Sequence, residues 1–368
     1  MSLDILFTSY ALGPYALRNR FVMSPMTRCR ATADGVPTEL MAEYYGQRAT
    51  AGLIVTEGVA PSPNGKGYAR IPGLWNTAQV EAWKKVTHAV HAKGGTIFAQ
   101  LMHTGRIGHA ANLTPGAQML APSDVAAAGQ MWTDAQGMQP NTPPRAMTDT
   151  EVRVAIAEFV EAAKHAIAAG FDGVELHGAN GYLIEQFLNP DSNRRTDEWG
   201  GTLEKRIAFA VHVAEAVAKA IGGAKVGMRL SPHGAASDMK PYDDVLPTYV
   251  ALVNKLAGAG LAYLHVLDHS SLGSPPVPQA TKDAIRAHWP RTVIVAGGLD
   301  AASAAQVIDS KAGDLAGFAR AFISNPDFVE RTRRGAALTA ANPAMFYSPG
   351  PDGYTDYPAA AETITNTK

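Results

Sequence analysis

The sequence of 368 residues contains a single cysteine, Cys29. One thiol excludes an intramolecular disulfide, and it cannot form a zinc or iron–sulfur site that needs several cysteines. Such sparing use of cysteine is typical of proteins from a reducing compartment. We therefore expect a cytoplasmic protein with no disulfide framework and no metal centre.

The sequence also lacks a charge imbalance and long apolar runs. The 32 basic and 33 acidic side chains leave a formal net charge of -1, which predicts no attraction to nucleic acid or to an anionic membrane. No apolar run approaches the ~20 residues that span a bilayer, and the first ten residues contain neither Lys nor Arg. We expect no signal peptide and no membrane anchor, a small-molecule substrate, and a monomer or homodimer.

Short apolar runs alternate regularly with longer segments of helical period. This pattern is typical of βα units around a parallel sheet. Eight such units predict an α/β fold of the closed (β/α)8 TIM-barrel type, one domain over residues 1–368, rather than an open doubly wound sheet. The predicted strands are 20–24, 53–57, 96–101, 173–176, 225–230, 263–266, 292–296 and 315–318. The predicted helices are 38–49, 77–92, 149–169, 203–221, 241–259, 280–288, 301–309 and 327–335.

Three segments interrupt this alternation. Residues 102–148 follow the third strand, are rich in Pro, Gly, Asn and Gln, and are too long for a routine connection. We interpret them as an excursion over the barrel mouth. Residues 1–19 resemble a short hairpin that could plug the barrel bottom, and the tail after Asn342 could wrap the outside or reach the mouth.

Polar residues stand at the carboxyl ends of several predicted strands. In a barrel of this type, such side chains converge on one site. The first strand leads into Pro25, Met26 and Thr27, and the second leads into Gly58. Gln100 lies on the third strand and Arg229 on the fifth, where the two side chains could line a ligand or simply satisfy each other.

The ends of the last two strands resemble a phosphate site. The seventh strand ends in Gly297 and Gly298, and the eighth in Ala319 and Arg320, before a helix that opens near residues 324–327. Glycine loops and the free N–H groups of a helix start form the usual phosphate cradle of this fold, to which an arginine adds a fork. A surface salt bridge is the alternative for Arg320, and its position beside the glycine pair favours the phosphate.

His177, Asn180 and Tyr182 follow the fourth strand within one stretch that begins at Val174. His177 and Asn180 can both present N–H donors to one ligand oxygen, and the Tyr182 hydroxyl can approach as a general acid. This set suits a carbonyl-bearing substrate, whereas a zinc site would need more ligands. On position alone, buried packing of His177 and Tyr182 is an equal alternative.

Several motifs, in order along nearly the whole chain, resemble the Old Yellow Enzyme family of FMN-dependent ene-reductases. The resemblance is strongest to the bacterial N-ethylmaleimide and nitrate-ester reductases of that family. The motifs are NRFVMSPMTR at 19–28, AQLMHTGR at 99–106, ELHGANGYL at 175–183, QFLNP at 186–190, RRTDEWGG at 194–201 and GYTDYP at 353–358.

The resemblance implies FMN across the barrel mouth, with NADPH or NADH as the hydride donor. It implies a ping-pong cycle in which flavin N5 gives hydride to the β-carbon of an activated C=C bond, as in enones and maleimides, and nitrate esters and nitroaromatics are further candidates. His177 and Asn180 would bind the substrate oxygen, which phenols mimic in this family, and Tyr182 would supply the proton. The implied FMN-binding residues are Pro25, Met26, Thr27, Gly58, Gln100, Arg229, Gly297, Gly298, Ala319 and Arg320. The expected walls of the substrate pocket are Tyr68, Met102, Met131 and Tyr347.

Some positions depart from the common pattern of the family. Ala319 stands where many members have glycine, Met102 replaces an aromatic residue, and Asn180 stands where close relatives have His. Cys29 is offset from the position, here Thr27, at which another branch carries a thiol.

Two other functions remain open on the sequence. A phosphosugar aldolase or isomerase would share the barrel and the phosphate site but needs a buried lysine or a poised carboxylate, for which Glu57 is the one candidate near a strand end. A flavin-binding protein without turnover, such as a redox sensor, is the second alternative.

Overall fold

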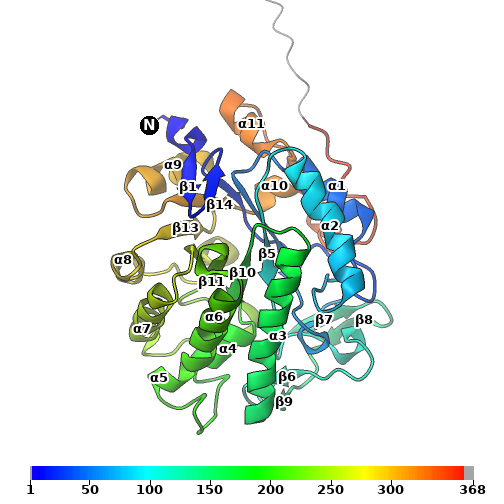
Figure 1. Ribbon diagram of the computed structural model, residues 1–368, viewed down its shortest axis with the longest axis vertical. Helices are drawn as coiled ribbons and strands as arrows, with labels where there is room; N and C mark the ends of the chain where they lie inside the picture. The colour runs from blue at the N-terminus through cyan, green and yellow to red at the C-terminus, as the bar shows by residue number, and fades with distance from the viewer. Residues whose placement is uncertain (1, 360–368) are drawn as a thin grey trace, which may run out of the picture.

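Eight parallel strands form a closed barrel in the computed structural model, which describes residues 2–359 (Figure 1). Each barrel strand pairs with the barrel strands that precede and follow it in the chain, and β14 pairs with β3 to close the ring. Nearly all strand residues are buried, because one face of each strand points into the barrel and helices cover the other. The barrel strands are β3 (Phe21–Met23), β4 (Leu53–Val59), β5 (Ile97–Leu101), β10 (Gly173–Gly178), β11 (Val226–Leu230), β12 (Tyr263–Leu267), β13 (Thr292–Ala296) and β14 (Leu315–Phe318). The predicted fold class is confirmed.

The helices differ from the prediction in four places. The predicted helix 203–221 is divided at Ile207, and the helix expected from residue 241 begins at Val245. Two short helices that the sequence did not predict, α4 (Leu183–Leu188) and α10 (Arg320–Ser324), follow β10 and β14. The other α-helices are α1 (Glu39–Gln47), α2 (Thr77–His91), α3 (Asp149–Ala168), α5 (Leu203–Arg206), α6 (Ala208–Ile221), α7 (Val245–Gly258), α8 (Gln279–His288), α9 (Ala301–Asp309) and α11 (Phe328–Arg334). Short 3-10 helices are η1 (Asp4–Phe7), η2 (Pro63–Gly65), η3 (Ala110–Asn112), η4 (Gly223–Lys225), η5 (Ala236–Asp238), η6 (Ser270–Leu272) and η7 (Pro343–Met345). In the part of the chain that the structure describes, no helix combines the length and apolar character needed to cross a membrane.

The N-terminal hairpin closes the bottom of the barrel, as predicted. Strands β1 (Tyr10–Leu12) and β2 (Tyr15–Leu17) pair antiparallel. Leu12 and Leu17 are buried in a cluster with barrel residues that include Val22 and Phe98. The hairpin therefore supplies the apolar floor on which the inner side chains of the barrel rest.

The segment between β5 and α3 carries four short strands. Strands β6 (Leu120–Ala121) and β9 (Arg145–Ala146) pair in parallel, and β7 (Gln130–Thr133) and β8 (Gly137–Pro140) form an antiparallel hairpin. These strands lie at the lower right in Figure 1, away from the N-terminal hairpin. Met131 on β7 is buried in one cluster with Met102 and Tyr182, so the hairpin packs against the expected substrate region.

Buried arginines hold the C-terminal tail against the barrel. Arg28 donates to the carbonyl oxygens of Phe346 and Gly353, at 3.0 and 2.6 Å. The Tyr354 ring stacks on Tyr44 of α1 with 4.0 Å between centroids. As a result Phe346 and its neighbour Tyr347 line the large cavity described below, so the tail reaches the mouth.

Glu57 lies beneath this tail and is itself almost fully buried. Its carboxylate accepts hydrogen bonds from the backbone N–H groups of Arg28 and Cys29, at 3.2 and 3.3 Å. Burial nevertheless raises the pKa of Glu57 from 4.5 to about 7. The Glu57 side chain does not line the large cavity, which removes the carboxylate that the aldolase alternative required.

We expect the free energy of unfolding to fall as the pH rises from about 5 to about 8, because Glu57 is protonated more readily in the folded state than in the unfolded state. The contribution is complete below pH 4.5 and is lost as the pH passes about 7. At ~1.4 kcal/mol per pKa unit, the loss reaches about 3 kcal/mol. Urea unfolding of wild type and Glu57→Gln at pH 5 and pH 8 measures it, and the variant should show the smaller change. Equal pH dependence in both proteins would contradict this assignment.

Candidate active site

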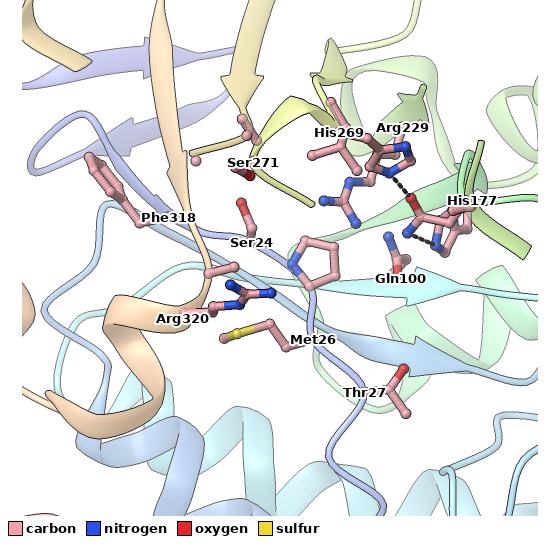
Figure 2. Close-up of a pocket in the computed structure, with 18 of the residues that line it drawn as sticks. Ser24, Met26, Thr27, Gln100, His177, Arg229, His269, Ser271, Phe318 and Arg320 are labelled. Atoms are coloured by element: carbon pink, nitrogen blue, oxygen red, sulfur yellow. Dashed lines mark hydrogen bonds between the residues drawn. The ribbon is translucent and has the colours of Figure 1, made fainter. Parts of the chain in front are cut away.

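A cavity of about 540 Å³ opens at the carboxyl end of the barrel. Its volume lies in the range of ligand-binding pockets, ~300 to 1,000 Å³. In Figure 2, Arg320 and His177 lie on opposite sides of this space, with Arg229 and Gln100 between them. The predicted site residues that line it are Pro25, Met26, Thr27, Gln100, Met102, His177, Asn180, Tyr182, Arg229, Gly297, Gly298, Ala319, Arg320 and Tyr347.

Three predicted residues lie behind the cavity wall. Gly58 follows an irregularity in the pairing of β4 with β5, and a Cβ added there would lie 2.4 Å from the sulfur of Met102. Glycine at this position therefore makes room for Met102. The Tyr68 hydroxyl lies 2.8 Å from the Tyr182 hydroxyl, and Met131 packs in the same cluster.

Arg320 marks one end of the cavity. It is the first residue of α10, and its side chain is exposed, with no hydrogen bond or ion pair to another residue in the range 2–359. A helix start carries partial positive charge, so an arginine there is unfavourable unless an anion binds between them. Gly297 and Gly298, both with positive φ, line the same cavity.

The helix start at this end of the cavity is not the one that the sequence predicted. The helix that opens near residues 324–327 is α11, which begins at Phe328. The helix whose first residues line the cavity is α10, preceded by Ala319. A phosphate at this end would therefore meet the amino end of α10.

The centre of the cavity contains a buried positive charge. Arg229 is almost completely buried, and its Nε has no hydrogen-bond partner among the described residues. Burial lowers the pKa of Arg229, which Glu175 partly offsets. A buried cation with an unused donor favours a ligand atom that accepts hydrogen bonds or carries negative charge.

Gln100 is held by that same glutamate. Its amide donates to Glu175 Oε1 at 2.8 Å, and His265 Nδ1 donates to Glu175 Oε2 at 2.9 Å. The side-chain amide of Gln100 therefore has its hydrogen-bond partner in Glu175 rather than in Arg229. The arrangement leaves the guanidinium of Arg229 available to the cavity.

The opposite end of the cavity holds His177, near the end of β10, and Asn180 and Tyr182, which follow this strand. Asn180 Nδ2 lies 3.4 Å from His177 Nε2, and the His177 and Tyr182 rings meet edge to face with 4.9 Å between centroids. Burial and Arg229 hold the pKa of His177 well below its usual range, so the imidazole is neutral. Burial raises the pKa of Tyr182 to about 12, which keeps its hydroxyl protonated.

A buried hydrogen-bond network fixes the backbone of this loop. Asn180 has a φ of 60°, and its backbone N–H donates to Ser231 Oγ at 3.0 Å. The Ser231 hydroxyl donates to Glu185 Oε1 at 2.8 Å, and the Gly181 N–H donates to Glu185 Oε2 at 2.6 Å. The loop is therefore anchored from below before any ligand binds.

Several residues that the sequence analysis did not weigh also line the cavity. They include Ser24 at the end of β3, and His269 and Ser271 just after β12. The sixth strand was predicted correctly, but the polar residues that follow it were not predicted to belong to the site. The general rule that strand ends converge at one face of the barrel was the signal that could have found them.

The residues present fit FMN. The cavity combines an unpaired arginine at a helix start, a buried arginine with an unused donor, and a further buried polar atom without a partner in the described range, Ser24 Oγ. The first suits a phosphate, and the others suit the carbonyl and nitrogen edge of a polar ring. Barrel and site together define a flavin-dependent oxidoreductase of the (β/α)8 class.

Comparison with known proteins identifies the family. The model of the NADH:flavin oxidoreductase / NADH oxidase family matches residues 5–339. The chain is 40% identical to a chanoclavine-I aldehyde reductase of Penicillium roqueforti, over 97% of each chain. It is 39% identical to 12-oxophytodienoate reductase 7 of Oryza sativa subsp. japonica, over 96% of this chain and 94% of the relative. The solved structure of morphinone reductase superposes with a TM-score of 0.94 at 39% identity, over 99% of this chain and 98% of that one.

The chain belongs to this family, which is the Old Yellow Enzyme family. It is an FMN-dependent ene-reductase that uses a reduced nicotinamide, NADPH or NADH, as hydride donor. The resemblance inferred from the motifs is confirmed.

Proposed function

We propose that this enzyme reduces the activated C=C bond of enones and maleimides, with nitrate esters and nitroaromatics as further substrates. The observation that carries this proposal is the placement of two neutral N–H donors and one protonated hydroxyl, from His177, Asn180 and Tyr182, in the same cavity as Arg229. Bound FMN supplies the hydride. The whole chain would act as one domain in the cytoplasm, as a monomer or homodimer, without nucleic acid, and with residues 102–148 over the barrel mouth.

The residues of the chain then divide into three groups. His177 and Asn180 hold the substrate oxygen, which draws electron density from the double bond, and Tyr182 protonates the α-carbon. Each hydrogen bond to the oxygen contributes about 1 kcal/mol. Tyr68, Met102, Met131 and Tyr347 form or support the substrate walls. The FMN-binding group comprises Pro25, Met26, Thr27, Gly58, Gln100 and Arg229 along the ring, and Gly297, Gly298, Ala319 and Arg320 at the phosphate.

Anaerobic titration of the purified holoenzyme tests the reaction. NADPH or NADH should bleach the flavin absorbance, and cyclohexenone or N-ethylmaleimide should restore it. The matched controls are cyclohexanone and N-ethylsuccinimide, which keep the carbonyl but lack the double bond and should leave the flavin bleached. Bleaching that no alkene reverses would instead indicate a flavin-binding sensor, and a protein purified without flavin would contradict the proposal. Steady-state rates with both nicotinamides would establish which one is preferred.

A further inference from the structure

His269 contacts the side chain of Asn180 directly. It follows β12, is only 4% exposed and lines the same cavity. Its Nε2 lies 2.7 Å from Asn180 Oδ1, across 89 residues of sequence. Figure 2 shows this contact and the 3.4 Å approach of Asn180 Nδ2 to His177 Nε2 as two consecutive dashed lines. For both of the latter nitrogens to donate to one substrate oxygen, His177 must carry its proton on Nε2, so their approach is that of two neighbouring donors.

The partners determine which way the Asn180 amide faces. An amide oxygen only accepts hydrogen bonds, so Nε2 of His269 must carry the proton and donate it. The other ring nitrogen of His269, Nδ1, is buried without a partner among the described residues, as suits the unprotonated nitrogen of a neutral ring. Burial, followed by the nearby Arg229, lowers the pKa of His269 and keeps it neutral. With its oxygen turned to His269, the amide must direct its NH₂ group to the side of His177.

The backbone network cannot supply this orientation. Ser231 and Glu185 fix the main chain of Asn180 and Gly181, but the terminal torsion of an asparagine is broad and nearly two-fold. Without the contact to His269, the amide could rotate and present its oxygen to the substrate oxygen. Two acceptors would then face each other in a buried site, and the hydrogen bond would be lost.

We propose that His269 is a positioning residue for substrate binding, which locks the Asn180 amide with its NH₂ group toward the substrate oxygen. This inference rests on the proposed role of Asn180 and deepens it. It assigns to the loop after β12 a part in recognising the carbonyl or nitro oxygen of the substrate. His269 acts through Asn180 and donates nothing to the substrate itself.

Binding of p-chlorophenol to the oxidised holoenzyme, followed through the flavin absorbance, tests the inference without turnover. His269→Phe keeps the ring volume but lacks the donor, and we expect it to raise the dissociation constant about tenfold. His269→Gln offers an N–H donor again and should restore most of the affinity. Ser270→Ala, an exposed neighbour outside the cavity wall, is the control and should bind as the wild type does. The KM for cyclohexenone should follow the same order, with a smaller change in kcat.

A double-mutant cycle with Asn180→Ala separates the possible outcomes. In the Asn180→Ala background, His269→Phe should cause no further loss, because there is no amide left to orient. A full additional loss in that background, or wild-type binding by His269→Phe alone, would overturn the inference. If Asn180→Ala itself leaves phenol binding unchanged, the proposed role of Asn180 in substrate binding is contradicted, and the role of His269 that rests on it is contradicted as well. Equal loss by His269→Gln and His269→Phe, with a lowered melting temperature in both, would show a purely structural role.

Discussion

Replacement of Tyr182 by Phe is expected to slow reoxidation of the reduced enzyme by cyclohexenone about 10²- to 10⁴-fold, which is the usual contribution of a positioned proton donor. Reduction by the nicotinamide should change far less, because that half-reaction transfers a hydride and needs no proton from Tyr182. The substitution removes one oxygen from a side chain that is 8% exposed, so the ring and its contact with His177 remain. Stopped-flow absorbance of the flavin measures the two half-reactions separately.

Tyr68→Phe is the matched control for this prediction. It removes the hydroxyl that lies 2.8 Å from that of Tyr182 but leaves the proposed donor in place. The hydrogen bond from Tyr68 lowers the pKa of Tyr182, so its loss should make Tyr182 a weaker acid and slow the enone step modestly. A loss as large as that of Tyr182→Phe, or an equal effect of Tyr182→Phe on both half-reactions, would contradict proton donation by Tyr182.

The barrel could be predicted because its strands are short apolar runs separated by long amphipathic segments, a signal that each unit repeats. The short helices α4 and α10 could not. They contain six and five residues, and neither has a side-chain cap at its start. A helix of that length is not stable by itself, so packing against the barrel must determine it. The sequence therefore predicted the anion site from Arg320 but placed the helix start several residues too late.

The candidate site could be predicted where its residues stand at the ends of predicted strands, because those ends converge at one face of the barrel. The stretch from His177 to Tyr182 is of this kind, and its chemistry could be read from residue types. The contact of His269 with Asn180 joins two loops that are distant in sequence, and no local pattern reveals it. Likewise, the role of Gly58 depends on the Met102 side chain that occupies the space a Cβ would fill.

Replacement of Arg320 by Ala should yield protein that is purified largely without flavin. The side chain has no other hydrogen bond or ion pair in residues 2–359 and stands at the start of α10, so the barrel itself should lose little stability. Hydrogen bonds to a charged group contribute about 1.5 to 3 kcal/mol, which corresponds to roughly 10- to 100-fold weaker binding of FMN. Titration of the apoprotein with FMN, followed by quenching of flavin fluorescence, measures the dissociation constant.

Riboflavin provides the control for Arg320, because it has the same ring and ribityl chain but no phosphate. If Arg320 binds the phosphate, Arg320→Ala should weaken FMN binding and leave riboflavin binding as it is in wild type. The affinity of Arg320→Lys for FMN should lie between those of wild type and Arg320→Ala, because lysine keeps the charge but lacks the fork that matches phosphate oxygens. An equal loss of affinity for FMN and riboflavin would show that the substitution affects binding of the ring or the fold instead. Full flavin occupancy in Arg320→Ala would leave the glycine pair Gly297 and Gly298 and the N–H groups of α10 as the phosphate site.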